Sequence, residues 1–271
     1  VSYIDHNLLQ IGYENANDHV FLQDFAKKHG LYFSRAGNGI CHQIHLQRFA
    51  IPGQLLIGAD SHTPTSGSLG MLAIGTGGLD AAMAMAGKAY YLKMPEIINI
   101  ILEGNLNLGV YAKDVILEIL RIIRINGGKG KAIEYSGSGL NNLSILERAT
   151  IANMGAELGV TTSIFPSDHT TYDFMKAQKR EEHWKELKAD EGAQYDYQIK
   201  INLSSIEPLV AIPHSPDAVM RIKDLEKTRI DQVFIGSCTN SSYSDLATAA
   251  WILKDKTIHH NVSLAVSVGS R

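Results

Sequence analysis

The chain has 271 residues, of which 45% are hydrophobic and 20% are charged, and its formal net charge is −3 at pH 7. This balance is typical of a globular protein with room for two or three α/β units. The weak negative charge gives no reason to expect nucleic acid or an anionic membrane as the main partner. No run of residues approaches the ~18–20 apolar residues that a membrane span needs.

The two cysteines and the start of the chain bear on its compartment. Two cysteines in a chain of this length do not make a disulfide framework, which favours a reducing compartment. The first residues, VSYID, read as a strand, and no basic stretch precedes an apolar run there, so nothing resembles a signal peptide. We therefore expect a cytoplasmic protein. Because the first residue is Val1, we also expect a portion of a longer polypeptide.

Short apolar runs alternate with helical patterns along the chain, which predicts βαβ units and largely parallel sheets. The expected strands are residues 1–5, 54–60, 96–104, 131–135, 229–236 and 262–271. The expected helices are residues 15–30, 78–87, 112–128, 143–159 and 242–256. The fold class is therefore α/β.

Several of these segments carry more specific expectations. Strand 54–60 reads as buried, and the small-residue helix 78–87 should pack closely against a neighbour. Helix 112–128 should close at its two glycines, and helix 143–159 at Gly159. The charged segment 176–198 is expected at the surface. Residues 215–227 read as a linker with a short helix.

Polar clusters follow the expected strands at the ends where open α/β sheets bind ligands. An acid and a histidine follow residues 1–4. An acid, a serine and a histidine lie at the end of the second expected strand, and a cysteine follows strand 229–236. A further histidine follows a glycine-rich turn. These residues are Asp5, His6, His42, Asp60, Ser61, His62 and Cys238.

Each cluster also has a plain structural interpretation. Asp5 and His6 could be a helix cap with a satisfied histidine, and residues 60–62 could form an Asx turn with ordinary capping. His45 is expected on a solvated face. Glu157 falls near a helix C-terminus, where the macrodipole disfavours a carboxylate. It therefore needs a partner such as a histidine, unless it is simply exposed.

Cys238 is the most informative of these residues because it precedes an expected helix. The helix N-terminus favours thiolate over thiol, and thiolates attack electrophiles or bind soft metals. A buried, inert cysteine is the alternative, although the surrounding Ser, Thr and Asn residues argue against apolar burial. A nucleophile would need a histidine base, which His42 or His62 could supply. A cluster would need three or four thiolates, more than Cys41 and Cys238 provide.

Seven stretches of the sequence together resemble the aconitase family of iron–sulfur hydro-lyases. They are DHNLLQ, GNGICHQIHLQRFAIPG, LLIGADSHTPTSGSLGMLAIGTGGLDAAMAMAG, KDVILEILR, ATIANMGAELGVTTSIFP, YDYQIKINLSSIEP and IGSCTNSSYSDL. GADSHT and GSCTNS are specific to a superfamily that also holds isopropylmalate, homoaconitate and methylcitrate dehydratases. KADEGAQYDYQIKINLSSIEP is most similar to true aconitase of the shorter bacterial type.

The resemblance implies layered α/β/α domains with largely parallel sheets. On this basis we expect a first domain at residues 1–93, incomplete at its N-terminus, and a second at residues 94–212. Residues 213–271 would begin a third, truncated domain, because one helix and two strands cannot cover a sheet.

The resemblance also implies roles for individual residues. Cys238 matches the first of three cysteines that hold a [4Fe-4S] cluster, and Cys41 matches no ligand and reads as a small core residue. Asp5 and His6 match a pair that assists proton delivery to the leaving hydroxyl. The remaining matches are active-site histidines, a carboxylate paired with one of them, substrate-contacting residues and the cluster environment. They are His42, His62, Glu157, Asp60, Ser61, Asn153, Ser237 and Asn240.

The function implied is part of an aconitate hydratase, which interconverts citrate and isocitrate through cis-aconitate. The other cluster cysteines, the substrate-binding arginines and the catalytic serine would come from the C-terminal remainder of the same polypeptide. We therefore expect the isolated chain to be inactive. One alternative is a dehydratase of the same superfamily acting on another branched hydroxy acid. A second is a non-enzymatic RNA-binding module, which the weakly acidic charge disfavours.

Overall fold

The computed structural model describes all residues from Val1 to Arg271. The chain divides into two compact units: unit 1 comprises Val1–His45 and Ile230–Arg271, and unit 2 comprises Leu46–Arg229. Every strand pair is parallel except β9 (Leu209–Ala211) with β10 (Val219–Arg221). The expected α/β class with largely parallel sheets is confirmed. The division at residues 93/94 and 212/213 stays a prediction.

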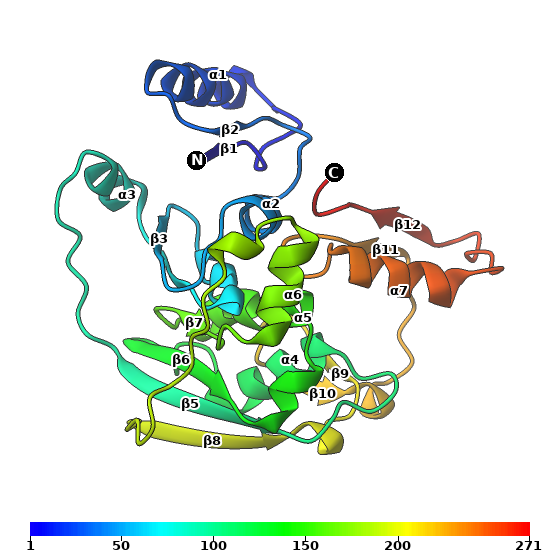
Figure 1. Cartoon of the computed structure of the whole chain (residues 1–271). Coiled ribbons are helices and arrows are strands. Elements are labelled where there is room, and N and C mark those ends of the chain that lie inside the picture. Colours follow the sequence, from blue (N-terminus) through cyan, green and yellow to red (C-terminus); the bar gives the residue numbers. More distant parts are fainter. The chain divides into compact units, whose positions relative to one another are not determined.

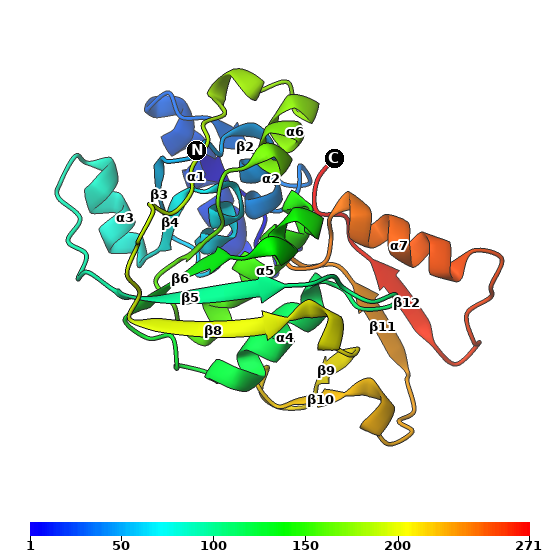
Figure 2. The ribbon, with the colours of Figure 1, turned by 60° about the horizontal axis from the view of Figure 1, so that its bottom comes forward.

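A four-stranded parallel sheet lies along one side of unit 2 (Figures 1 and 2). Its spatial order is β7 (Ser163–Ile164), β6 (Lys131–Ser136), β5 (Glu96–Glu103) and β8 (Tyr197–Asn202). The two central strands match the predicted strands 96–104 and 131–135. The two edge strands are short or half exposed and gave no clear apolar run, so the sequence analysis missed them.

Two helices, α4 (Ala112–Ile123) and α5 (Ile145–Met154), bury the main hydrophobic core of unit 2 against the sheet. Every second residue of β5 points into this core, because side chains alternate along a strand. The residues are Ile98, Ile100 and Leu102, and none is more than 3% exposed. Each such side chain contributes about 1.5–3 kcal/mol by its removal from water.

The two core helices end differently from one another. The α5 helix continues as a 3₁₀ turn, η3 (Gly155–Leu158), and stops at Gly159 with φ 75°, as predicted. The α4 helix stops at Ile123, so the predicted closure at Gly127 and Gly128 is wrong. Gly128 instead donates its N–H to the Leu158 carbonyl, and a Cβ there would collide with the Val160 side chain. Gly128 therefore allows the backbone to pack closely against Val160.

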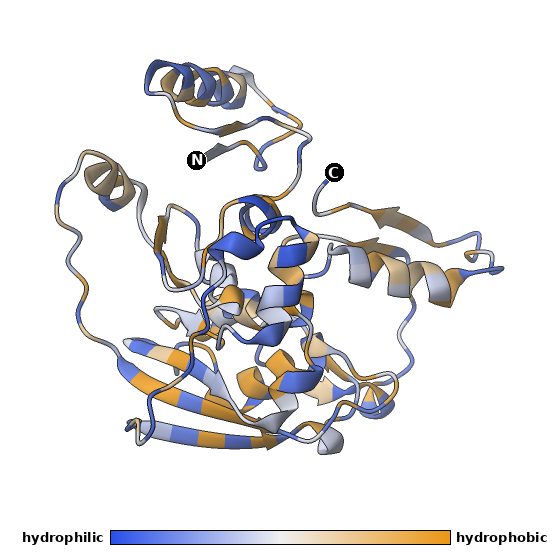
Figure 3. Ribbon diagram, viewed as in Figure 1, coloured by the Kyte–Doolittle hydropathy of each residue, from blue (hydrophilic) through white to orange (hydrophobic).

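A second layer of unit 2 joins β3 (Leu55–Gly58) and β4 (Leu72–Gly75) through a 3₁₀ segment, η1 (Thr63–Leu69), whose residues are all buried. Its core consists of Leu46, Ala50, Leu69, Met71, Ala73, Ile145 and Ala149. The prediction that strand 54–60 is buried is wrong, since Leu55 is 57% exposed. Helix α3 (Gly78–Met85) is apolar (Figure 3) but has no buried residue, so its predicted close packing is wrong too.

The rest of unit 2 consists of short elements. They are α6 (His169–Ala177), η2 (Ser138–Asn142), η4 (Glu181–His183), η5 (Leu203–Ser205) and η6 (Ile222–Asp224), besides β9 and β10. Segment 176–198 is largely exposed, as predicted, and Arg180 anchors it by donating to the carbonyls of Leu46, Gln47 and Ala50. The helix expected within 215–227 is a single 3₁₀ turn, η6, which follows strand β10.

Unit 1 contains two βαβ arrangements. In the first, α1 (Tyr13–Lys28) connects β1 (Ser2–Tyr3) to β2 (Phe33–Ser34); in the second, α7 (Tyr243–Leu253) connects β11 (Gln232–Ile235) to β12 (Ser263–Val266). Residues at the start of α2 (Cys41–Arg48) link them, because Ile40 donates its N–H to the Gly269 carbonyl at 2.7 Å. None of the helices in the chain is long and apolar enough to cross a membrane.

Candidate active site

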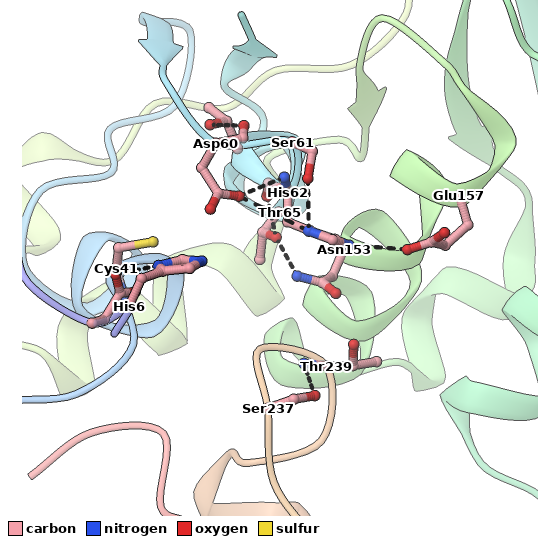
Figure 4. Close-up of polar contacts among 12 residues, drawn as sticks. His6, Cys41, Asp60, Ser61, His62, Thr65, Asn153, Glu157, Ser237 and Thr239 are labelled. Carbon is pink, nitrogen blue, oxygen red and sulfur yellow. Dashed lines mark hydrogen bonds and ion pairs between the residues drawn. The ribbon is translucent and has the colours of Figure 1, made fainter. Parts of the chain in front are cut away.

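A histidine–carboxylate pair lies at the carboxyl end of β3 in unit 2 (Figure 4). The Nε2 atom of His62 lies 3.2 Å from Oε1 of Glu157, and its Nδ1 atom lies 3.2 Å from the Ser61 hydroxyl. Because a carboxylate only accepts, Nε2 carries the proton towards Glu157. The side chains of His62 and Glu157 are 24% and 39% exposed, so the pair reaches solvent.

Asp60 shapes the turn that presents His62. Its Oδ1 atom accepts the His62 backbone N–H at 2.7 Å, which is an Asx turn. The same oxygen lies 3.9 Å from Nδ1 of His62, which is beyond hydrogen-bond distance. The structural interpretation of residues 60–62 and the functional one are therefore both compatible with this geometry.

Glu157 reaches His62 because η3 packs tightly behind it. A Cβ at Gly155 would collide with the Ser163 hydroxyl, and a Cβ at Gly67 of η1 would collide with the Ser163 carbonyl. Both 3₁₀ segments, η1 and η3, therefore pack closely against Ser163 of β7. Asn153, at the end of α5, adds a direct link by donating its Nδ2 to the Thr65 hydroxyl at 2.9 Å.

In unit 1, Asp5 holds two neighbours at once. Its Oδ1 atom accepts from Nδ1 of His6 at 2.9 Å, and its Oδ2 atom accepts the backbone N–H of Cys41 at 2.6 Å. Burial by itself would raise the pKa of Asp5, but these hydrogen bonds and the nearby His6 outweigh burial and lower the pKa below its ordinary value. The His6 side chain is 73% exposed.

The start of α2 carries Cys41 and His42. Cys41 is half-buried, so its interpretation as a core residue is wrong. His42 is buried. His45 is half-buried and its Nδ1 lies 2.9 Å from the hydroxyl of Tyr3, so its expected place on a solvated face is wrong as well.

Cys238 is a half-buried cysteine that forms no disulfide, and it lies on the turn between β11 and α7. Ser237, with φ 66°, turns the backbone there, and Asn240 donates Nδ2 to Asp245 at 3.2 Å. Asp245 also caps α7 through a reciprocal hydrogen bond with Ser242. Hydrogen bonds to Asp245 therefore connect the turn to the N-terminus of α7. The Cys238 thiol is not fully buried in apolar packing.

The structure therefore groups the predicted site residues within each unit. Unit 2 brings together Asp60, Ser61, His62 and Glu157, with Asn153 behind them. Unit 1 holds Asp5 and His6 beside Cys41, and Ser237 and Asn240 beside Cys238. The convergence of these groups on one surface stays a prediction. Sequence reasoning missed Thr65, whose signal was a hydroxyl residue three positions after His62 in a tight turn.

The number and position of the cysteines show whether this chain can supply the ligands of an iron–sulfur cluster. Cys238, on a polar turn next to a helix N-terminus, suits one thiolate ligand. The chain has two cysteines in all, and the Cys41 backbone and side chain hydrogen-bond to Asp5. A set of three or four thiolates cannot be assembled from this chain.

Parallel α/β units that place histidine–carboxylate pairs after strands are typical of enzymes that move protons. The chain belongs to the aconitase family: the model described as "Aconitase family (aconitate hydratase)" matches residues 3–229 and 222–271. The resemblance found in the sequence is thereby confirmed.

Curated relatives fall into two groups. The 3-isopropylmalate dehydratase large subunit 2 of Archaeoglobus fulgidus is 42% identical over 269 residues, which cover 99% of this chain and 65% of the relative. Large subunit 1 of Thermotoga maritima is also 42% identical, with the same coverage. The mitochondrial aconitate hydratase of Aspergillus fumigatus is 43% identical over 94% of this chain and 34% of its own length. The chain thus spans 65% of the first group and about a third of the second.

Proposed function

We propose that the chain forms part of a hydro-lyase that removes water from, and adds it to, a hydroxy acid with two or more carboxylates. Family membership and the names of the relatives support the reaction class. The single observation that carries the proposal is the contact between His62 Nε2 and Glu157 Oε1 at 3.2 Å. It supplies a positioned imidazole that can hold or release a proton.

In this proposal the two histidine–carboxylate pairs have different tasks. His6 donates a proton from its exposed Nε2 to the departing hydroxyl, while Asp5 holds Nδ1 and stabilises the imidazolium. His62 and Asp60 contact the substrate, and Glu157 fixes the orientation of the His62 ring. Ser61 adds a hydroxyl at the same edge. His42 is assigned as a further active-site histidine, and Asn153, Ser237 and Asn240 are assigned to the environment that the cofactor would have when bound.

The proposed cofactor is a [4Fe-4S] cluster with Cys238 as one ligand and with the other two thiolates supplied by the remainder of the polypeptide. When bound, it supplies a Lewis acid that polarises the substrate hydroxyl. The C-terminal remainder is accordingly an obligatory partner of this chain.

Two substrates are candidates. Citrate, in an aconitate hydratase of the tricarboxylic acid cycle, agrees with the tricarboxylic acid expected from the sequence motifs. The second candidate is 3-isopropylmalate, supported by an alignment to an isopropylmalate dehydratase large subunit that covers 99% of this chain, against 94% for the aconitate hydratase of Aspergillus fumigatus. Identities of 42% and 43% do not favour either one. A cytoplasmic location is also a proposal, since some relatives are named mitochondrial.

The test is an assay of the complete polypeptide, with its cluster reconstituted anaerobically, against citrate and 3-isopropylmalate in separate reactions. We expect formation of the unsaturated acid from one of them, and loss of that activity in the E157Q variant. Turnover of 3-isopropylmalate alone would overturn the citrate assignment. Turnover of neither, by a protein with a full complement of iron, would overturn the hydro-lyase.

A further inference from the structure

A second contact joins the same two elements that bring His62 and Glu157 together. The Thr65 hydroxyl donates to the His62 carbonyl at 2.6 Å and accepts from Asn153 Nδ2 at 2.9 Å (Figure 4). Thr65 and Asn153 are both fully buried. The Thr65 backbone N–H also donates to the His62 carbonyl at 3.0 Å, so one residue holds that carbonyl twice.

The direction of these bonds follows from the atoms involved. A threonine hydroxyl has one proton, and a carbonyl oxygen can only accept. The proton of Thr65 is therefore committed to the His62 carbonyl, and Asn153 must turn its NH₂ group towards Thr65. This fixes the orientation of the Asn153 amide and leaves its Oδ1 atom directed away from the Thr65 hydroxyl.

The placement of this link relative to the catalytic pair gives it a role. Thr65 lies in η1, which begins directly after His62, and Asn153 lies in the last turn of α5, which runs on into η3 with Glu157. The hydroxyl thus joins the backbone that carries the imidazole to the helix that carries its carboxylate. Without the hydroxyl, the His62 carbonyl would lose one of its two donors, and the buried Asn153 amide would lose Thr65 as an acceptor.

We propose that Thr65 is a positioning residue, whose hydroxyl sets the distance and orientation of His62 relative to Glu157 through the His62 carbonyl and the Asn153 amide. This inference deepens the proposed function and rests on it for its catalytic consequence. The geometric part concerns the His62 ring alone, and can be measured without turnover.

The experiment compares T65V, which keeps the shape and removes the hydroxyl, with T65S, which keeps the hydroxyl. The matched control is T171V in α6. Thr171 is equally buried, and its hydroxyl has no hydrogen-bond partner. The first readout is the ¹⁵N NMR spectrum of the His62 ring in the 271-residue chain, which reports which ring nitrogen carries the proton. The second is the pH profile of kcat in the complete polypeptide.

We expect wild type, T65S and T171V each to show a single tautomer of the His62 ring, with the proton on Nε2. We expect T65V to show a mixture of ring forms, a shifted pH profile and a kcat lower by up to about 100-fold, as for a misplacement of about 1 Å. An unchanged His62 spectrum in folded T65V would overturn the inference. If T65V does not fold, T65A takes its place, with the same criterion. A changed spectrum together with an inactive wild type would uphold the positioning role and refute the proposed function.

Discussion

The Nε2 atom of His62 lies 3.2 Å from Oε1 of Glu157, although 95 residues separate the two along the chain. Two 3₁₀ segments, η1 and η3, place them together by packing against Ser163 of β7. An imidazole held by a carboxylate has a defined orientation and a stabilised cationic form, which are the properties that proton transfer needs. This pair is the centre from which the predictions follow.

Replacing Glu157 with Gln tests the pair directly. The amide has nearly the same shape but carries no charge, so it cannot stabilise a cationic His62. We expect the kcat of the complete polypeptide to fall by about 10²-fold or more, in line with the usual contribution of acid–base groups. The matched control is E118Q in α4, where Glu118 pairs with Arg121 at the surface. Equal activities of E157Q and E118Q would contradict the role of Glu157.

The lowered pKa of Asp5 predicts how stability depends on pH. A carboxyl whose pKa is lower in the folded than in the unfolded state stabilises the fold above its unfolded pKa, about 3.9 for Asp. That stability is lost as the pH falls through the folded pKa. We therefore expect D5N to lower the urea midpoint at pH 7, and the difference from wild type to shrink as the pH falls below about 4.

The control for this measurement is D24N, because Asp24 lies exposed on α1 of the same unit. Its urea midpoint should follow that of wild type at every pH. A deficit in D5N that stays constant from pH 7 to pH 3 would show that the ionised carboxylate is not what stabilises the fold.

Iron binding by the isolated chain tests whether one suitably placed cysteine is enough to hold a cluster. With one suitably placed cysteine, Cys238, the 271-residue chain should retain no stable [4Fe-4S] cluster after anaerobic reconstitution and desalting. Iron and sulfide analysis and the visible absorbance measure this. In the complete polypeptide, C238S should lose the cluster while C41S retains it. Four iron atoms per isolated chain, removed by C238S, would contradict the prediction.

Arg148 is a fully buried cation on α5, the helix that leads to Glu157. It donates to both carboxylate oxygens of Asp168, at 3.0 and 2.7 Å, and to the carbonyls of Leu140, Leu143 and Pro166. Removing one member of a fully buried pair commonly costs about 3–5 kcal/mol; here Asp168 is 31% exposed, but three carbonyls also lose their donor. We expect a loss of this order in R148M.

The same substitution at a surface pair is the control for Arg148. R121M removes the pair with Glu118 at the exposed side of α4 and should cost about 0–1 kcal/mol, because exposed ion pairs contribute little. Urea unfolding followed by circular dichroism gives both free energies. A loss in R148M no larger than that in R121M would contradict the anchoring role of Arg148.

Several features could be predicted from local patterns alone. The apolar run of β5, the periodic apolar residues of α4 and α5, and Gly159 as a helix stop all appear in the structure where expected. Predictions from local patterns were wrong where contacts with residues distant in the sequence determine the structure. Gly128 packs against Val160 instead of ending a helix, and α3 is apolar without being buried. The edge strand β8 has few buried residues, and so its sequence carried a weak signal.

The sequence by itself determined the family, the α/β class and the placing of Asp5, Asp60, His62 and Cys238 after strands, because periodicity, turn residues and motifs are encoded locally. Only the tertiary structure decided that Glu157 is the partner of His62 and that Thr65 joins Asn153 to the turn that carries it. The physical reason is that such contacts depend on how η1, α5 and η3 pack around Ser163. That packing is set by distant residues, and a hydrogen bond between side chains leaves no periodic trace in the sequence.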